Sequence, residues 1–234
     1  MAFTTINGQV YTPGLAIVDS PQPYTPLGGD TLQLAIDVSG NGQLSSSSSS
    51  DATQFHAITL FLTSHELSKN FTISNGTEPN NKAYVGPVLE INPSTNVQQV
   101  DWVWSACLVG DDRSGSDTAR GPYNISIHQS FKWDGKDYHT IFDLPVNVSN
   151  SIPKSDRRID CGLLENDLLK PAEIAASNDT LSGQPWVDAD AGTNGGHNNG
   201  SSSGDGETNN GVHVRGTLKQ WGLFAMLVGG LLLV

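Results

Sequence analysis

Short runs in which apolar and polar residues alternate recur along residues 3–150 of this chain. Successive side chains of a β-strand point to opposite faces, so this period of two predicts strands with one buried face. The clearest runs lie at 31–38, 56–63, 100–108, 123–131 and 142–148. They are short, turn residues separate them, and they lack helical periodicity. The pattern predicts an all-β domain, an antiparallel β-sandwich spanning residues 3–174.

Individual runs also predict which side chains are buried. In the run at 56–63, His56 is expected to share one face with Ile58, Leu60 and Leu62. In the run at 100–108, two tryptophans fall on the apolar side. We therefore expect Trp102 and Trp104 to lie in the core, although exposed rings on a sandwich would also suit sugar stacking.

The dipeptide Asp134-Gly135 joins the last two runs, and this pair is typical of a two-residue β-hairpin turn. Trp133 stands at the tip of that hairpin, where we expect it to be exposed and able to stack on a sugar ring. His128 and His139 flank the same turn, so they are expected to face each other across it. Surface histidines are favoured there over a metal site.

Cys107 and Cys161 are the only cysteines of the chain. A disulfide between them would close a loop whose entropic contribution is about 4 kcal/mol. Two buried thiols or a metal site are the alternatives, but clustered Cys/His spacing is absent. We predict the disulfide, which would hold residues 159–174 on the sandwich. Leu163 to Leu168 are expected to form one or two helical turns before Pro171.

Two segments have a composition that favours disorder. The run Ser45–Ser50 lies in a predicted loop at 40–53, and residues 175–211 are rich in Gly, Ser, Asn and Asp. With little to bury, the second segment is predicted to be a disordered stalk. The first is either a flexible, O-glycosylated loop or a tolerated insertion without a role.

The last residues, Trp221–Val234, form an uncharged apolar run that is shorter than the roughly 20 residues of a comfortable membrane span. A spacer at 212–220 precedes it, and small polar residues precede the spacer. This order is typical of a GPI-attachment signal at 212–234, which is removed on maturation. Candidate attachment residues are Asn209, Asn210 and Gly211. A tail-anchored helix, or an apolar end that docks on the domain, is the alternative.

Secretion is also favoured by six Asn-x-Ser/Thr sequons that lack proline at the middle position. They begin at Asn70, Asn75, Asn124, Asn147, Asn178 and Asn199. The first ten residues contain neither the basic region nor the apolar region of a secretion signal. We expect a signal to have been removed or lost, with the mature chain starting near Phe3.

Charge and motifs exclude several functions. The net charge of −12 argues against nucleic acid as a partner, since binding to phosphates requires a basic surface. No catalytic or phosphate-binding motif is present, and no cofactor is expected. Asp111, Asp112 and Asp117 form an acidic loop that we interpret as solvated rather than calcium-binding. We predict no catalytic residue and no metal ligand.

With its apolar tail, its stalk and its predicted sandwich, the whole chain resembles a GPI-anchored cell-surface glycoprotein of a filamentous fungus. The strand GPYNISIHQSF resembles Ig-like domains of fungal wall proteins linked to β-glucan assembly. The resemblance implies an Ig-like sandwich held at the outer leaflet of the plasma membrane or in the cell wall. It assigns no functional residue.

Three functions are consistent with these features. The first is a non-enzymatic surface protein, anchored to the membrane through its GPI lipid, that serves wall organisation, adhesion or polysaccharide recognition. The second is a wall-remodelling glycosidase or transglycosidase whose carboxylates come together only in the fold. The third is a secreted protein that a host or partner receptor recognises.

Overall fold

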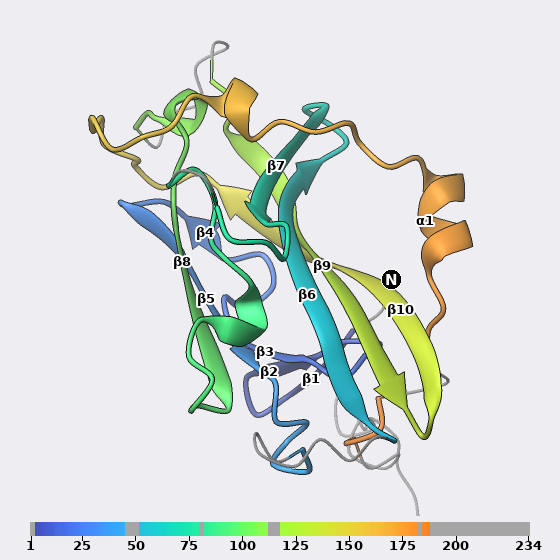
Figure 1. Cartoon of the computed structure of the whole chain (residues 1–234). Coiled ribbons are helices and arrows are strands. Elements are labelled where there is room, and N and C mark those ends of the chain that lie inside the picture. The colour runs from blue at the N-terminus through green and yellow to red at the C-terminus, as the bar shows by residue number, and fades with distance from the viewer. Residues whose placement is uncertain (1–2, 45–51, 80–81, 112–117, 182–183, 188–234) are drawn as a thin grey trace, which may run out of the picture. The chain divides into compact units, whose positions relative to one another are not determined.

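The computed structural model describes residues 3–44, 52–79, 82–111, 118–181 and 184–187, and within them two five-stranded sheets (Figure 1). The first sheet has the order β1 (Thr4–Ile6), β2 (Gln9–Tyr11), β3 (Ile17–Ser20), β5 (Thr31–Asp37), β8 (Val97–Val103). The second has the order β4 (Pro26–Leu27), β10 (Lys136–Val148), β9 (Gly121–Trp133), β6 (Gln54–Ser64), β7 (Lys69–Ser74). Neighbours run antiparallel except β4 and β10, which are parallel. The prediction of an all-β fold is confirmed.

A common apolar core joins the two sheets. It is built from the inward residues of the alternating runs, such as Leu34 of β5 and Leu60 of β6. Trp102 and Trp104 are almost completely buried in it, as predicted. Each indole N–H donates to a backbone carbonyl oxygen, 3.1 Å away at Ala83 for the first ring and 3.2 Å away at Gly28 for the second. These bonds allow two polar indoles to lie in the core without an unpaired donor.

Gln129 of β9 connects the sheets through hydrogen bonds rather than apolar contact. Its side chain is fully buried, and its Oε1 accepts from the backbone N–H groups of Leu15 at 3.1 Å and Ala16 at 2.8 Å. Its Nε2 donates to Thr12 Oγ1 at 2.9 Å. The segment before β3 is thereby fixed to β9 by a single side chain whose polar atoms are paired.

The predicted hairpin is present. β9 and β10 pair from Trp133↔Lys136 to Gly121↔Val148. Asp134 and Gly135 connect them with φ angles of 48° and 78°, as a type I′ turn requires. The turn therefore sets the register of the two longest strands of the second sheet.

β6 contains an irregularity that changes which residues face the core. Phe55 pairs with Phe131, and Ala57 pairs with Ser130, so His56 is the extra residue of a bulge. The prediction that His56 shares the buried face with Ile58 is therefore wrong. The His56 ring is exposed, and its Nε2 lies 3.1 Å from Asp137 Oδ1.

The disulfide between Cys107 and Cys161 is present, as predicted. Three short 3₁₀ helices, η1 (Val88–Glu90), η2 (Ala106–Leu108) and η3 (Cys161–Leu163), accompany the strands. The prediction of helical turns across 163–168 is wrong, because η3 ends at Leu163 and the helix α1 (Pro171–Ser177) begins at the proline. Proline suits the first turn of a helix, where its missing N–H leaves no bond unmade.

The chain stays packed on the domain beyond the predicted boundary at residue 174. Asp179 N donates to His139 O at 2.7 Å, and Gln184 Nε2 donates to Gly14 O at 3.0 Å. The first of these bonds engages the open edge of β10, whose backbone groups need partners. The rest of the predicted stalk, the attachment candidates, the apolar tail and the run Ser45–Ser50 of the predicted loop lie outside the described residues. Among the residues that the structure describes, no helix has the length and apolar character needed to cross a membrane.

Candidate functional site

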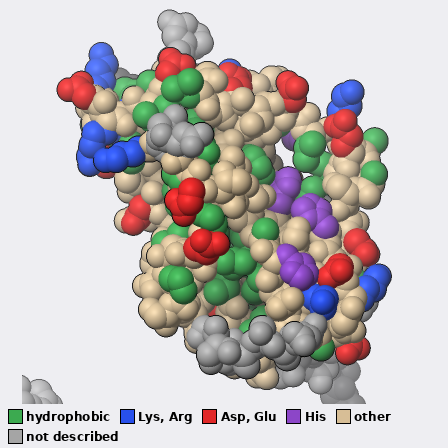
Figure 2. Space-filling model, viewed as in Figure 1, with side chains coloured by type: hydrophobic (Ala, Val, Ile, Leu, Met, Phe, Trp, Pro, Cys, Tyr) green, Lys and Arg blue, Asp and Glu red, His purple; other side chains and the backbone are tan. Residues whose placement is uncertain are grey.

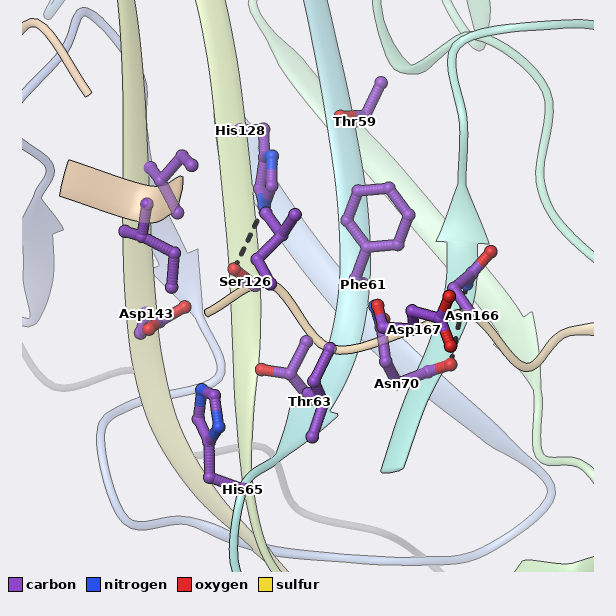
Figure 3. Close-up of a pocket in the computed structure, with 14 residues that line it drawn as sticks. Thr59, Phe61, Thr63, His65, Asn70, Ser126, His128, Asp143, Asn166 and Asp167 are labelled. Carbon is purple, nitrogen blue, oxygen red and sulfur yellow. Dashed lines mark hydrogen bonds between the residues drawn. The ribbon is translucent and has the colours of Figure 1, made fainter. Parts of the chain in front are cut away.

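The outward face of the second sheet carries a cavity of about 290 Å³, which we call the outer-face pocket (Figure 3). Its floor is formed by outward side chains of three neighbouring strands, Thr59, Phe61, Thr63, Ser126, His128, Ile141 and Asp143. The strand register brings them into rows. Phe61 pairs with Ser126, and Ser126 pairs with Asp143. Alternation places these residues on the face opposite the core, so the same pattern that builds the core also builds this floor.

A wall of the outer-face pocket, above the floor, is formed by residues 164–174, which we call the strap. It leaves η3, runs past β7 and reaches α1 beside β10 (Figure 1). Thr72 N donates to Leu164 O at 2.9 Å, and Asn166 N donates to Asn70 O at 2.8 Å. The strap thus covers the free edge of β7 as a short additional strand would. Beyond this point its side chains, including those of Asp167 and Leu168, line the pocket.

His128 is the most perturbed titratable group of this site. Burial and, to a smaller extent, the nearby His139 together lower the pKa of His128 to about 4, and Asp143 opposes this shift. The ring is therefore neutral near pH 7. The Nε2 atom of His128 lies 3.2 Å from Ser126 Oγ. The ring centroids of His128 and His139 lie 6.1 Å apart, so the two histidines face each other as predicted. Figure 2 shows histidine side chains gathered over this face of the molecule.

The rim beside β7 is made of amide and carboxylate groups. Asn70 Nδ2 donates to Asp167 O at 2.8 Å, and Asn166 Nδ2 donates to Thr72 Oγ1 at 2.9 Å. Figure 3 shows Asn70, Asn166 and Asp167 across the cavity from Asp143, with the Phe61 ring between them. An aromatic ring bordered by hydrogen-bond donors and hydrogen-bond acceptors is an arrangement suited to a small polar ligand.

Ser126 and His128 form a hydroxyl–imidazole pair, which raises the question of nucleophilic catalysis. A serine nucleophile requires a base that is itself oriented by a third group, usually a carboxylate. Among the described residues, the His128 ring has no ion pair with Asp143 within 4.0 Å. The pair is therefore a hydrogen-bonded element of the pocket floor and lacks the geometry of a triad. Within the described ranges, no three His, Cys, Asp or Glu side chains come together as a metal site requires.

Trp133 lies at the tip of the β9–β10 hairpin, as predicted, but it is not freely exposed. The ring is half-buried and meets Trp186 edge-to-face, with ring centroids 5.1 Å apart. The Trp186 ring also packs against Gly40, where an added Cβ would come within 2.7 Å of it. A tertiary contact from residues 184–187 therefore covers part of the surface proposed for stacking. The stacking role of Trp133 stays a prediction.

The sequon asparagines differ in their surroundings. Asn75 and Asn147 are exposed, whereas Asn124 and Asn178 are half-buried and Asn70 is buried. Asn178 Oδ1 accepts from Ile141 N at 3.2 Å, on the open edge of β10. Asn199 lies outside the described residues. Glycosylation at these positions stays a prediction, and Asn70 is the one whose side chain the folded chain encloses.

Sequence reasoning did not find the outer-face pocket. Thr59, Ser126 and Asp143 fall on the polar sides of the alternating runs, where solvent is the usual neighbour. One sequence feature indicates that part of this polar face is covered, namely the apolar residues of the strap, which include Leu168 and Leu169. Such residues imply a surface to cover, but the sequence does not say which one.

Searches with this chain against protein-family models, curated proteins and solved structures each return no match.

Proposed function

We propose that this protein is a non-enzymatic cell-surface glycoprotein that recognises a short saccharide in its outer-face pocket. The recognition would serve adhesion or the organisation of a cell wall. The observation that carries the proposal is the composition of the pocket, in which one aromatic ring is bordered by amide, hydroxyl and carboxylate groups.

The physical basis is the dual character of a sugar ring. Its C–H face is apolar and packs on an aromatic ring such as Phe61, while its hydroxyls need both donors and acceptors. Asn166 supplies an amide at the rim, and Asp143 supplies an acceptor on the floor. The cavity volume of about 290 Å³ is at the small end of the range for ligand pockets, about 300–1,000 Å³, which favours a short ligand.

The test compares this pocket with the aromatic residue at the hairpin tip. The full chain, Phe61→Ala and Trp133→Ala are applied to an array of wall oligosaccharides, and affinities for each bound glycan are measured by calorimetry. Loss of the aromatic surface in Phe61→Ala is expected to weaken binding at least roughly tenfold. Trp133→Ala is expected to bind as the parent does. Binding that is lost in Trp133→Ala and kept in Phe61→Ala would reject the pocket.

The proposed location follows from the GPI-attachment pattern and the sequons. Intact cells of a fungal host that express the chain behind a secretion signal are treated with phosphatidylinositol-specific phospholipase C, and the protein is followed by blotting before and after deglycosylation. We expect release into the medium and a lower mass after deglycosylation. An unglycosylated protein confined to the cytosol would contradict the proposal.

We further propose that the domain is an Ig-like sandwich. Strands β3, β5 and β8 correspond in order to strands A, B and E of that fold, and β6, β9 and β10 correspond to C, F and G. Tyr123, near the start of β9, donates its hydroxyl to Ala119 O at 2.5 Å, which supports a tyrosine corner. The disulfide does not join the strands that correspond to B and F, so it differs from that of antibody domains.

A glycosidase is the second candidate, because Asp143 on the floor and Asp167 on the strap line the same pocket and lie across it from each other. Two carboxylates on either side of a sugar are the catalytic groups of most glycoside hydrolases. Release of reducing ends from wall glucans is measured for the full chain, Asp143→Asn and Asp167→Asn. Turnover that either variant abolishes would establish the enzyme. Binding without turnover would favour recognition alone.

A further inference from the structure

Asn70 opens the sequon Asn70-Phe71-Thr72 and also holds the strap in place. It lies in β7 at the edge of the second sheet, and its side chain is directed to the outer face, where Thr63 is its cross-strand partner. The strap passes directly over this position. Asp167, which contacts Asn70, follows it by 97 positions in the sequence.

The atom that a glycan would occupy is already used by the strap. Asn70 is 7% exposed, and its Nδ2 donates to the backbone oxygen of Asp167 at 2.8 Å. Its Oδ1 is buried without a hydrogen-bond partner among the described residues. A sugar attached to Nδ2 must lie where the strap now lies, because so little of this side chain reaches solvent.

The hydroxyl of the sequon is engaged by the same segment. Thr72 is 7% exposed, and its Oγ1 accepts from Asn166 Nδ2 at 2.9 Å. The glycosylating enzyme must bind both the asparagine and the hydroxyl of a sequon. Both groups are free only while the strap is undocked. The strap is undocked during synthesis, because the sequon emerges long before the strap does.

We propose that N-glycosylation of Asn70 and docking of the strap are mutually exclusive, so that a glycan at Asn70 fixes an open form of the outer-face pocket. In the modification, Asn70 Nδ2 forms a bond to the anomeric carbon of a lipid-pyrophosphate-linked oligosaccharide and loses a proton. The bond from that carbon to the pyrophosphate oxygen breaks, and the lipid pyrophosphate leaves with the electron pair. The glycosylated chain then lacks the pocket wall that contains Asp167 and Leu168.

The inference rests on the proposed function in one respect, which is that the natural chain passes through the secretory pathway. The experiment removes this dependence. The full chain is expressed behind a heterologous secretion signal in yeast, and lectin chromatography with peptide mass mapping separates molecules with and without a glycan at Asn70. Amide hydrogen exchange of peptides from 163–174 is then compared between the two forms.

Exchange of the Asn166 N–H in the strap peptides is expected to be at least roughly tenfold faster in the Asn70-glycosylated form, since its bond to Asn70 O is lost. The Thr72 N–H of β7 loses its acceptor, Leu164 O, at the same time. Thr77→Ala removes the sequon at the exposed Asn75 and is the matched control, with strap exchange unchanged. Thr72→Ser keeps the hydroxyl that pairs with Asn166 in a less efficient sequon. This variant is expected to increase the protected, unglycosylated fraction.

Two results would overturn the inference. One is an Asn70-glycosylated form whose strap amides stay as protected as those of the unglycosylated form. The other is secreted protein that carries a glycan at Asn75 and none at Asn70 in any molecule. Neither result depends on saccharide binding or on GPI attachment, so failure here is distinguishable from failure of the proposed function.

Discussion

At the scale of single residues, the fold lowers the pKa of His128 far enough to change its protonation between pH 6.5 and 4. Burial, together with the nearby His139, holds its pKa near 4, against about 6.5 in an unfolded chain. Below pH 6.5 the unfolded state therefore takes up a proton that the folded state does not bind until about pH 4. The contribution of His128 to stability is complete above pH 6.5 and is lost as the pH falls toward 4.

We expect the free energy of unfolding to fall by up to about 3 kcal/mol from this group between pH 6.5 and 4. Urea unfolding of the parent, His128→Gln and His65→Gln at several pH values measures it. His128→Gln removes the titrating ring and should flatten this pH dependence. His65→Gln, an exposed histidine at the end of the same face, should keep it. If the free energy of unfolding changed with pH equally in the parent and in His128→Gln, the assignment of this pH dependence to His128 would be wrong.

At the scale of elements, the β9–β10 hairpin is the unit most fully encoded by local sequence. Its turn needs positive φ at two consecutive residues, which Asp tolerates and Gly adopts without strain. Nothing lies within 4 Å of a Cβ added at Gly135, so a substitution there changes backbone strain without a clash.

Gly135→Ala is therefore expected to lower the free energy of unfolding by about 1 kcal/mol, through the left-handed conformation that alanine disfavours. Asp134→Asn, which keeps a residue tolerant of that conformation, is the matched control and should stay within about 0.5 kcal/mol of the parent. Chemical denaturation followed by tryptophan fluorescence checks both. A neutral Gly135→Ala would mean that the turn relaxes into another type.

The strap, unlike the hairpin, is an element whose position local sequence does not encode. Its position depends on the free edge of β7 and on polar outer-face residues distant in sequence. The alternating pattern identified Ser126 and Asp143 as outward residues, and this is where they lie. It did not show that another segment covers them, because a polar residue facing solvent and one facing a polar cavity give the same pattern.

At the scale of the whole molecule, the two sheets are joined by the apolar core and by the hydrogen bonds of Gln129. Gln129→Leu would keep the volume but leave the N–H groups of Leu15 and Ala16 without their acceptor. Buried donors without partners cost about 1–3 kcal/mol each. We expect a loss of about 3 kcal/mol in the free energy of unfolding.

Gln99→Leu is the control for this substitution, because Gln99 is exposed on β8 and the chemical change is the same. It should change stability by no more than about 0.5 kcal/mol. Equilibrium urea unfolding compares the two variants with the parent. A Gln129→Leu protein as stable as the parent would show that the segment before β3 finds other acceptors.

The sequence alone determined the all-β class, the hairpin turn, the burial of Trp102 and Trp104, and the pairing of the only two cysteines. Each follows from alternation, turn chemistry or elimination within the chain. Tertiary structure decided three other features, which are the bulge at His56, the contact of Trp186 with Trp133 and the outer-face pocket. They arise where segments far apart in sequence meet, as Asp167 meets Asn70, and local patterns carry no information on which surfaces pair.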